Sequence, residues 1–311
     1  PLNYYCYKTA NSITIDGQLT EQAWQNAPWS EPFIDITGNT DLNPPLNTRM
    51  KMLRDKDHLY IAAELEEPHI WATLKKRDAI IYYDNDFEVF LDPDGDGENY
   101  YEIEINAYGT IFDLFLPKPY NKGGRPKISW DCTTMKSAVG IDGTINDPSD
   151  TDDKWTVELA IPWESLSYKN INPLIPGPGD SWRINFSRVQ WEAVVRDGEY
   201  EKETDPATGK SLPEDNWVWS PQGVVNMHQP ETWGYVNFCD NTVNEKSQSD
   251  TRKDLPRFWV WMGGNKNRSV QGWDSLFQNL NDIGIRGVLI NTDTALLNKI
   301  IPIAVKNIYR S

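Results

Sequence analysis

Residues 80–116 constrain the fold of this chain most, because their side chains alternate with a period of two. In the segment DFEVFLD, the apolar residues Phe87, Val89 and Leu91 alternate with Glu88, Phe90 and Asp92, and YYEIEIN and IFDLFL repeat the pattern. Period two places successive side chains on opposite faces of a β-strand. The intervening runs are rich in Asp, Gly and Asn, which favour turns. The stretch therefore predicts an antiparallel meander with acidic groups on one face.

Short alternating segments continue on both sides of this meander. The clearest cover residues 48–53, 58–64, 155–161, 181–190 and 233–238. Many short strands separated by turn residues are typical of a sandwich. We therefore predict a mainly β fold, an antiparallel β-sandwich over residues 1–240. Within it we expect an edge strand at residues 4–9 and a long polar loop at residues 192–217.

The C-terminal part of the chain has a different pattern. Residues 241–256 are polar and predict a linker. Four segments follow in the order strand 258–262, helix 273–283, strand 287–291 and helix 295–309. Strand and helix in alternation are the unit of a parallel α/β fold, and two such units cannot close a barrel. We predict that residues 257–311 form a partial α/β segment.

The charge of the chain excludes several classes of partner. It has 311 residues, with 46 Asp and Glu against 30 Lys and Arg, a net charge of −16. Nucleic acids and anionic membranes require a basic patch, so we expect neither as a partner. No apolar run approaches the ~20 residues of a membrane span. The three cysteines fit no metal motif and are expected to be free thiols.

Four segments resemble the family 9 carbohydrate-binding modules, in the wider set of DOMON-like sandwiches. They are ITIDGQLTEQAWQNA, HLYIAAELEEPHI, DNDFEVFLDPDGD and WTVELAIPWESL. The resemblance implies a non-catalytic module that binds poly- or oligosaccharides. It also implies export to the cell surface, the periplasm or the extracellular space. No signal peptide is visible in the sequence.

The C-terminal segment carries a second resemblance. RFWVWMGGNKN and WDSLFQNLNDIGIRGVLINTD are similar to the opening of a (β/α)8 glycoside-hydrolase-like barrel. The alternative function is therefore a glycan-active enzyme, a glycoside hydrolase, whose barrel is truncated here. Glu102 and Glu104 on one strand face would lie about 7 Å apart, within the range of glycosidase carboxylate pairs. A further alternative is a scaffold that has lost ligand binding.

The resemblance also implies a sugar site, since family 9 modules clamp a sugar between two aromatic rings. The first ring corresponds to Tyr82 or Tyr83, followed by Asp84, and the second to Trp217 or Trp219. The family's polar groups correspond to positions around Glu102, Glu104 and Asn106. An aromatic ring covers the C–H face of a pyranose, while carboxylates and amides bond to its hydroxyls. The alternative is that the tryptophans pack in the core, and we expect one of Trp217 and Trp219 to do so.

Three further residues are candidates for sugar contact by their position in the chain. Trp130 follows a Pro- and Gly-rich run, and Arg188 and Trp191 lie together in SRVQW. The alternative for Trp130 is that it anchors its loop. The alternative for Arg188 is an ion pair with a carboxylate of the meander.

The turn of the acidic hairpin is a candidate calcium loop. Asp92, Asp94 and Asp96 precede Gly97 in the order Asp-x-Asp-x-Asp-Gly. The full pattern has Glu at its twelfth position, where this chain has Ile103. The alternative is a solvated hairpin turn without a metal. Calcium is the one cofactor that the sequence suggests.

Overall fold

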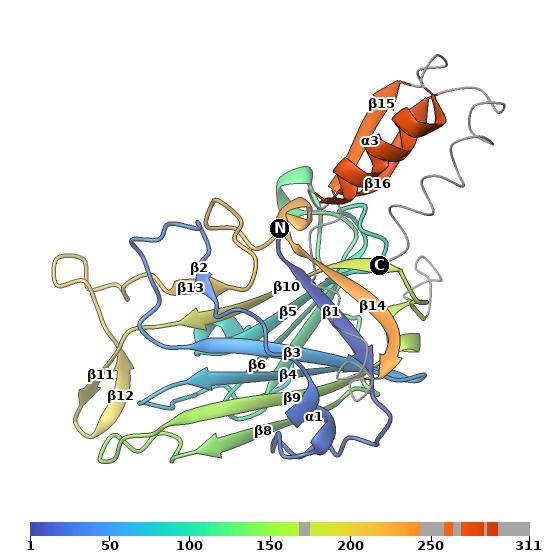
Figure 1. The fold of residues 1–311 in the computed structure, drawn as a ribbon. Helices are drawn as coiled ribbons and strands as arrows, with labels where there is room; N and C mark the ends of the chain where they lie inside the picture. Colours follow the sequence, from blue (N-terminus) through green and yellow to red (C-terminus); the bar gives the residue numbers. More distant parts are fainter. Residues whose placement is uncertain (168–174, 243–257, 264–268, 283–284, 292–311) are drawn as a thin grey trace. The chain divides into compact units, whose positions relative to one another are not determined.

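The computed structural model describes residues 1–167, 175–242, 258–263, 269–282 and 285–291. The chain divides into two compact units, Pro1–Ser247 and Gln248–Ser311. In the first unit, a 12-stranded sheet contains most of the described strands (Figure 1). In the second, two strands form a parallel pair next to one helix.

The first unit begins with β1 (Asn3–Lys8), α1 (Gln22–Asn26), β2 (Ile34–Asp35), β3 (Thr48–Arg54) and β4 (His58–Glu66). The meander follows as the 3-10 turn η1 (Ile81–Tyr83), β5 (Asp86–Asp92), β6 (Tyr100–Asn106), β7 (Ile111–Leu116) and η2 (Tyr120–Lys122). Next come β8 (Lys136–Asp142), β9 (Lys154–Pro162), η3 (Trp163–Leu166) and β10 (Ser181–Gln190). The unit ends with β11 (Ala193–Arg196), β12 (Glu199–Lys202), β13 (Asp215–Val218), η5 (Pro230–Thr232) and β14 (Gly234–Thr242).

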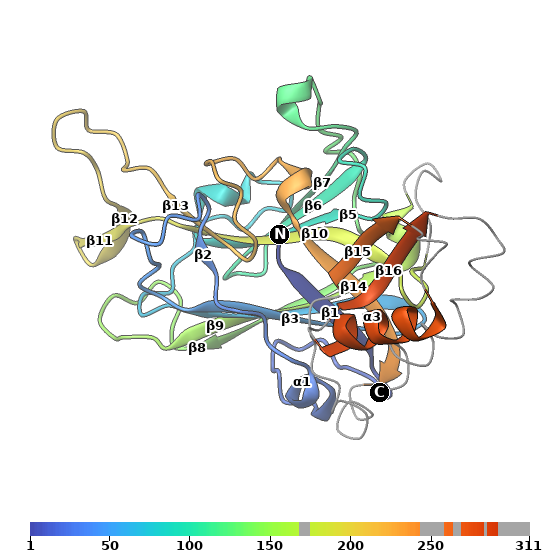
Figure 2. The ribbon, with the colours of Figure 1, turned by 45° about the horizontal axis from the view of Figure 1, so that its top comes forward.

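The large sheet curls so that its two halves face each other. Its strand order is β7-β6-β5-β10-β14-β1-β3-β4-β9-β8, with β13 paired to β10 and β2. Figure 2 shows β3, β8 and β9 in one layer, and β5, β6, β7 and β10 in the other. Both layers contribute to one core, through residues such as Met52, Ile61 and Leu159 from the first and Val89 and Phe186 from the second. The predicted mainly β sandwich is confirmed.

The first strand differs from its prediction. β1 lies inside the sheet, parallel both to β14 (Tyr5 opposite Asn237) and to β3 (Tyr7 opposite Leu53). It is therefore not an edge strand but the link between the two halves. Tyr4 and Cys6 point into the core, whereas Tyr7 packs toward α1. An edge strand and a central strand can share one local pattern, so sequence alone could not separate them.

The turn before α1 explains two of the sequence motifs. The carboxylate of Glu158 on β9 accepts hydrogen bonds from the backbone N–H groups of Asp16 and Gly17, at 3.0 Å each. It also accepts one from Trp24 Nε1 at 2.7 Å. Glu158 is fully buried, so these donors satisfy a costly group. The segments IDGQLTEQAW and WTVELAIP thus contact each other through these hydrogen bonds, with the donors in the first and Glu158 in the second.

The predicted polar loop at residues 192–217 contains regular structure. β11 and β12 form an antiparallel hairpin in which Val195 pairs with Tyr200. Asp197 and Gly198 join the strands with φ of 53° and 84°. Asp-Gly with positive φ at both positions is the preferred two-residue hairpin turn. The prediction of a loop was wrong because it followed the polar composition of the segment and gave no weight to the Asp-Gly turn.

The second unit is described over β15 (Phe258–Gly263), α3 (Val270–Asp282) and β16 (Ile285–Asn291). The strands are parallel, with Val260 opposite Val288. Trp273 and Phe277 are buried and stack at a centroid distance of 5.7 Å, as their helical spacing predicts. The predicted helix at residues 295–309 and most of the predicted linker lie outside the described residues. The proposed domain boundaries therefore stay a prediction.

Two further sequence predictions concern the cysteines and membrane-spanning segments. Cys6, Cys132 and Cys239 are free thiols, and the first two are buried. None of the helices in the described ranges is long and apolar enough to cross a membrane.

Candidate functional site

A cavity of about 690 Å³ lies over the outer face of β5, β6 and β7. Its floor is made of alternate strand residues: Glu88, Phe90, Glu102, Glu104, Phe112 and Leu114. Loop residues that include Tyr82, Tyr120, Met227 and His228 form the walls. The face that the sequence predicts to be acidic is therefore enclosed by loops. Every residue of β5 and β6 is buried, on both faces of the meander.

One wall of the cavity is aromatic. Tyr120 and His228 meet edge to face at a centroid distance of 4.5 Å. The Tyr100 hydroxyl lies 3.0 Å from His228 Nδ1. Burial lowers the pKa of His228 to about 4, so its ring is neutral at physiological pH. Burial also raises the pKa of Tyr120 to about 12. This wall therefore offers two uncharged rings, those of Tyr120 and His228, and the hydroxyl group of Tyr120.

The floor of the cavity carries carboxyl groups. Glu88 and Glu104 are directly opposite each other on β5 and β6, and Glu102 is two residues from Glu104. Burial raises the pKa of Glu102 and of Glu104 well above the usual range, and that of Glu88 to about 7. In the described part of the chain none of the three has an ion-pair partner. A neutral carboxyl group donates as well as accepts hydrogen bonds.

Tyr82 is held over this floor by its backbone. Its N–H donates to Glu104 Oε2 at 3.0 Å, and its carbonyl accepts from Trp191 Nε1 at 2.8 Å. A hydrogen bond to Tyr83 and burial raise the pKa of Tyr82 to about 12. Tyr83 itself is 49% exposed and does not line the cavity. Of the two predicted tyrosines, the structure brings Tyr82 to the cavity.

Asp84 and Asn106 support the loop that carries Tyr82. Asp84 accepts hydrogen bonds from the backbone of Thr73 and Leu74, at 2.8 Å each, and from Asn106 Nδ2 at 2.9 Å. The side-chain oxygen Oδ1 of Asn106 accepts hydrogen bonds from the backbone N–H groups of Tyr108 and Thr110. The side chains of Asp84 and Asn106 are fully buried. Neither side chain lines the cavity, and both hold the loop that carries Tyr82 in place.

Trp217 and Trp219 both lie in the core, where we expected only one of them. They are 3% and 2% exposed and belong to the cluster between the layers. Residues two apart along a strand share a face, so both rings point inward. Asn216, which has the opposite parity, lines the cavity instead. Neither tryptophan lines the cavity, so a sugar contact by Trp217 or Trp219 stays a prediction.

The other three candidates for sugar contact, Trp130, Arg188 and Trp191, are all buried and contact other parts of the protein. Trp130 is buried against Tyr101, at a centroid distance of 4.8 Å, which is the loop-anchoring alternative. Arg188 is 1% exposed and pairs with Glu67 at 2.9 Å, not with a carboxylate of the meander. Trp191 is 7% exposed, and its Nε1–H donates a hydrogen bond to the backbone carbonyl oxygen of Tyr82. None of the three lines the cavity.

The predicted calcium loop forms a tight turn. One carboxylate oxygen from each of Asp92, Asp94 and Asp96 lies within 4.8 Å of the others. Asp92 accepts from the N–H groups of Gly95 and Gly97 at 3.0 Å each. Burial raises the pKa of Asp92 to about 7. Calcium at this turn stays a prediction.

The sequence reasoning did not name Glu88, Phe112, Tyr120 and His228 as site residues. A signal existed for the first two, because Glu88 and Phe112 lie opposite Glu104 in the paired strands. Tyr120 and His228 are more than 100 residues apart in loops, and no local pattern joins them.

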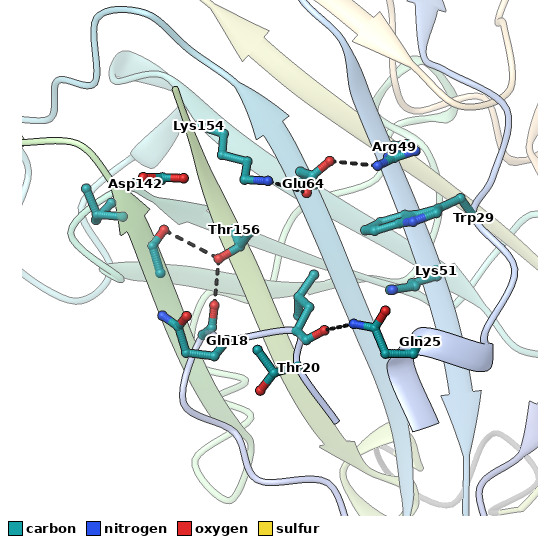
Figure 3. A pocket seen from close by; sticks show the side chains of 14 residues that line it. Gln18, Thr20, Gln25, Trp29, Arg49, Lys51, Glu64, Asp142, Lys154 and Thr156 are labelled. Carbon is teal, nitrogen blue, oxygen red and sulfur yellow. Dashed lines mark hydrogen bonds and ion pairs between the residues drawn. The ribbon is translucent and has the colours of Figure 1, made fainter. Parts of the chain in front are cut away.

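A second hollow, of about 530 Å³, lies on the outer face of β3, β4, β8 and β9 (Figure 3). Figure 3 shows the Trp29 ring between Arg49 and Lys51, whose charged groups lie 4.3 and 4.0 Å from its centroid. Arg49 and Lys154 both bond to Glu64 at 2.9 Å. Because cations already cover the ring, this hollow is a poorer sugar site than the first cavity.

Two solved structures are similar to this chain. A proposed carbohydrate-binding protein from Bacteroides uniformis ATCC 8492 superposes with a TM-score of 0.55 at 14% identity, over 76% of this chain and 99% of its own. A family 9 module from Caldicellulosiruptor kristjanssonii, solved with glucose, has a TM-score of 0.47 at 16% identity, over 76% and 97%.

Two curated relatives match in sequence over 156 residues, half of this chain. They are endo-1,4-beta-xylanase C of Paenibacillus barcinonensis, 27% identical, and endo-1,4-beta-xylanase A of Thermoanaerobacterium saccharolyticum, 28% identical. The match spans only 12% and 11% of their lengths. The family model for carbohydrate family 9 binding domain-like proteins matches residues 15–177, more than half of the 311 residues. The chain belongs to this family.

Proposed function

We propose that the cavity over β5, β6 and β7 is the carbohydrate site of a non-catalytic binding module. Membership of the family supports the carbohydrate-binding role. The observation that carries the location is that Tyr82, Tyr120 and Glu102 line one cavity large enough for a sugar. In this proposal Tyr82 is kept from the predicted clamp of Tyr82 or Tyr83 with Trp217 or Trp219, and Tyr120 takes the place of the tryptophan.

The chemistry of the cavity suits a neutral sugar. Tyr82, Phe112 and Tyr120 offer apolar faces for the C–H groups of a pyranose. Glu102 and the neighbouring Asn216 offer hydrogen-bond groups for adjacent hydroxyls. A uronic acid would bring its carboxylate among buried carboxyl groups that have no cation beside them, so uronic acids are expected to bind poorly there. The xylanase names of the curated relatives favour β-1,4-linked xylo-oligosaccharides as the first ligands to test.

Calorimetric titration with xylo- and cello-oligosaccharides tests the site. We expect Tyr120→Ala and Glu102→Gln each to weaken binding at least tenfold, because each removes a contact inside the cavity. Tyr5→Ala is the control, since Tyr5 is an exposed tyrosine on β1 outside the cavity. If both cavity variants bind like the wild type, or if the intact chain binds no sugar, the proposal fails.

The same oligosaccharides separate binding from hydrolysis. A binding module should release no reducing sugar from any member of the panel. Release that is abolished by Glu102→Gln would instead favour the glycosidase alternative. Export to the periplasm, cell surface or medium is part of the proposal and rests on the family and on the xylanase relatives. Cell fractionation tests it.

A further inference from the structure

The hollow of about 530 Å³ on the outer face of β3, β4, β8 and β9 brings three cations together in an acidic protein (Figure 3). Arg49 and Lys51 are two residues apart on β3 and therefore share one face of that strand, and Lys154 comes from β9. Glu64 stands opposite Arg49 on β4. Its two carboxylate oxygens accept hydrogen bonds from Arg49 and Lys154 at 2.9 Å each. Two of the cations thus share one carboxylate, and the third does not pair with it.

Lys51, the third cation, has no carboxylate beside it. It is 3% exposed. Its ammonium group donates one hydrogen bond, to the Trp24 carbonyl oxygen at 2.7 Å, and lies 4.0 Å from the centre of the Trp29 ring. An ammonium group has three N–H donors, so two of them lack a hydrogen-bond acceptor in the described part of the chain. Burial lowers the pKa of Lys51 to about 8, so the ammonium form still prevails at neutral pH.

Lys51 differs in this respect from the other buried cations of the described residues. Arg188 is 1% exposed and pairs with Glu67 at 2.9 Å. Arg54 is 3% exposed, donates to two backbone carbonyl groups and lies 3.8 Å from Asp240. Buried charges are costly unless a group of opposite charge accompanies them. Among the buried Lys and Arg side chains in the described ranges, Lys51 alone has no carboxylate oxygen within 4.0 Å.

We propose that this hollow binds the carboxylate of an acidic sugar, a uronic acid, through Lys51 and Arg49. A carboxylate accepts charge-assisted hydrogen bonds from both an ammonium and a guanidinium group. The volume of the hollow lies in the range of small-molecule sites, so it has room for a sugar ring beside the anionic group. Gln18 and Thr20 are exposed, line the hollow and offer hydrogen-bond groups for sugar hydroxyls. Asp142, which also lines it, is exposed and pairs with no cation in the described chain, so Lys51 stays uncompensated.

The hollow and the first cavity lie on different layers of the sandwich and carry opposite charge. The cavity is on the layer of β5, β6 and β7, whereas β3, β8 and β9 of the hollow belong to the other layer (Figure 2). The cations that make the hollow a poor site for a neutral sugar favour a uronic acid, which the cavity disfavours. The inference therefore goes beyond the proposed function. Tyr120→Ala, a change in the first cavity, should leave the binding of a uronic acid unchanged, so either site can fail without the other.

Calorimetric titration of the intact chain with D-glucuronate at pH 7 and low salt tests the proposal. We expect Lys51→Met and Arg49→Gln each to weaken glucuronate binding at least tenfold. Lys51→Met keeps the apolar stem and removes the buried charge, and Arg49→Gln changes a side chain that is 35% exposed, so both should fold. Thermal unfolding checks this. Lys56→Met is the matched control, since the Lys56 side chain is 88% exposed and lies outside the hollow, and its affinity should stay within twofold of the wild type.

Acetate and sulfate separate a sugar site from a site for any small anion. Glucuronate should bind at least tenfold more tightly than either, because only glucuronate brings hydroxyl groups to the hollow. If acetate or sulfate binds as tightly as glucuronate, the hollow recognises a simple anion and the assignment to an acidic sugar is wrong. No glucuronate binding at millimolar concentration would also overturn the inference. So would binding that survives both Lys51→Met and Arg49→Gln, or binding that Tyr120→Ala removes.

Discussion

At the scale of single residues, strand parity decides which side chains reach the cavity. On β13, Trp217 faces the core, while its neighbour Asn216 faces the cavity. On β5, Val89 faces the core, while Glu88 and Phe90 face the cavity. Whether a strand residue can reach a ligand in the cavity therefore depends on the face to which its position assigns it, and not on whether it is a tryptophan or a glutamate.

His228 gives the cavity a pH dependence that can be measured. Its folded pKa of about 4 lies below the ordinary value of 6.5. The folded state thus binds fewer protons than the unfolded state between these values, so its stability is full above pH 6.5 and is lost as pH falls toward 4. A shift of this size corresponds to about 3 kcal/mol. In His228→Gln, urea unfolding should lose about 3 kcal/mol less than in the wild type between about pH 7 and pH 4.

The wild type and His228→Gln must be compared because carboxyl groups such as Glu102, whose pKa burial raises, also change protonation over this pH range in both proteins. Their contribution cancels in the difference, as glutamine retains a hydrogen-bond group for Tyr100. Parallel pH profiles for His228→Gln and the wild type would show that the imidazole is not held neutral by burial.

At the scale of elements, the turn at Asp16-Gly17 docks the N-terminal segment against the sheet. Gly17 has φ of 82°, and a Cβ there would lie 2.5 Å from Gly140 N on β8. Trp24 of α1 reaches Glu158 from the same segment. A glycine is needed here both for the left-handed backbone and for the close approach of β8.

Gly17→Ala should therefore destabilise the protein more than an alanine at another left-handed glycine. Gly198 is the matched control, with φ of 84° and no atom within 4 Å of the place a Cβ would occupy. We expect Gly198→Ala to cost about 1 kcal/mol for the backbone alone, and Gly17→Ala to cost about 3 kcal/mol because a clash adds to it. Urea unfolding measures both. Equal losses would mean that β8 moves away without cost.

At the scale of the whole molecule, the cavity is a product of the closed sheet and of loops distant in the chain. Tyr82, Tyr120 and His228 come from separate connections, and β13 adds Asn216. β1 joins the two halves of the sheet by pairing with both β14 and β3. Each of these contacts lies within the first compact unit, Pro1–Ser247.

A chain that ends at Ser247 should therefore fold and bind as the full chain does. We expect its oligosaccharide affinity to agree within twofold and its main thermal transition to be unchanged. Titration calorimetry and scanning calorimetry make the two measurements. A shortened chain that folds but loses binding would show that residues 248–311 contribute to the site.

Much of the fold could be predicted from local pattern. The alternation in the meander indicated β5, β6 and β7 within a residue or so, and residues 181–190 matched β10 without a shift. The position of β1 was missed because its pairing depends on β14, more than 200 residues away. The hairpin at Asp197-Gly198 was missed although its turn residues were visible.

One apolar and one acidic face of the meander follow from the amino-acid sequence, since alternation is a property of the strand alone. Motifs such as the one that ends at Trp24 likewise indicate the family. What covers the acidic face, in contrast, is set by tertiary contacts. Loops from distant parts of the chain bury Glu88 and Glu104 and bring His228 beside Tyr120. Contacts of such sequence separation leave no local pattern, because they depend on how the whole sheet closes.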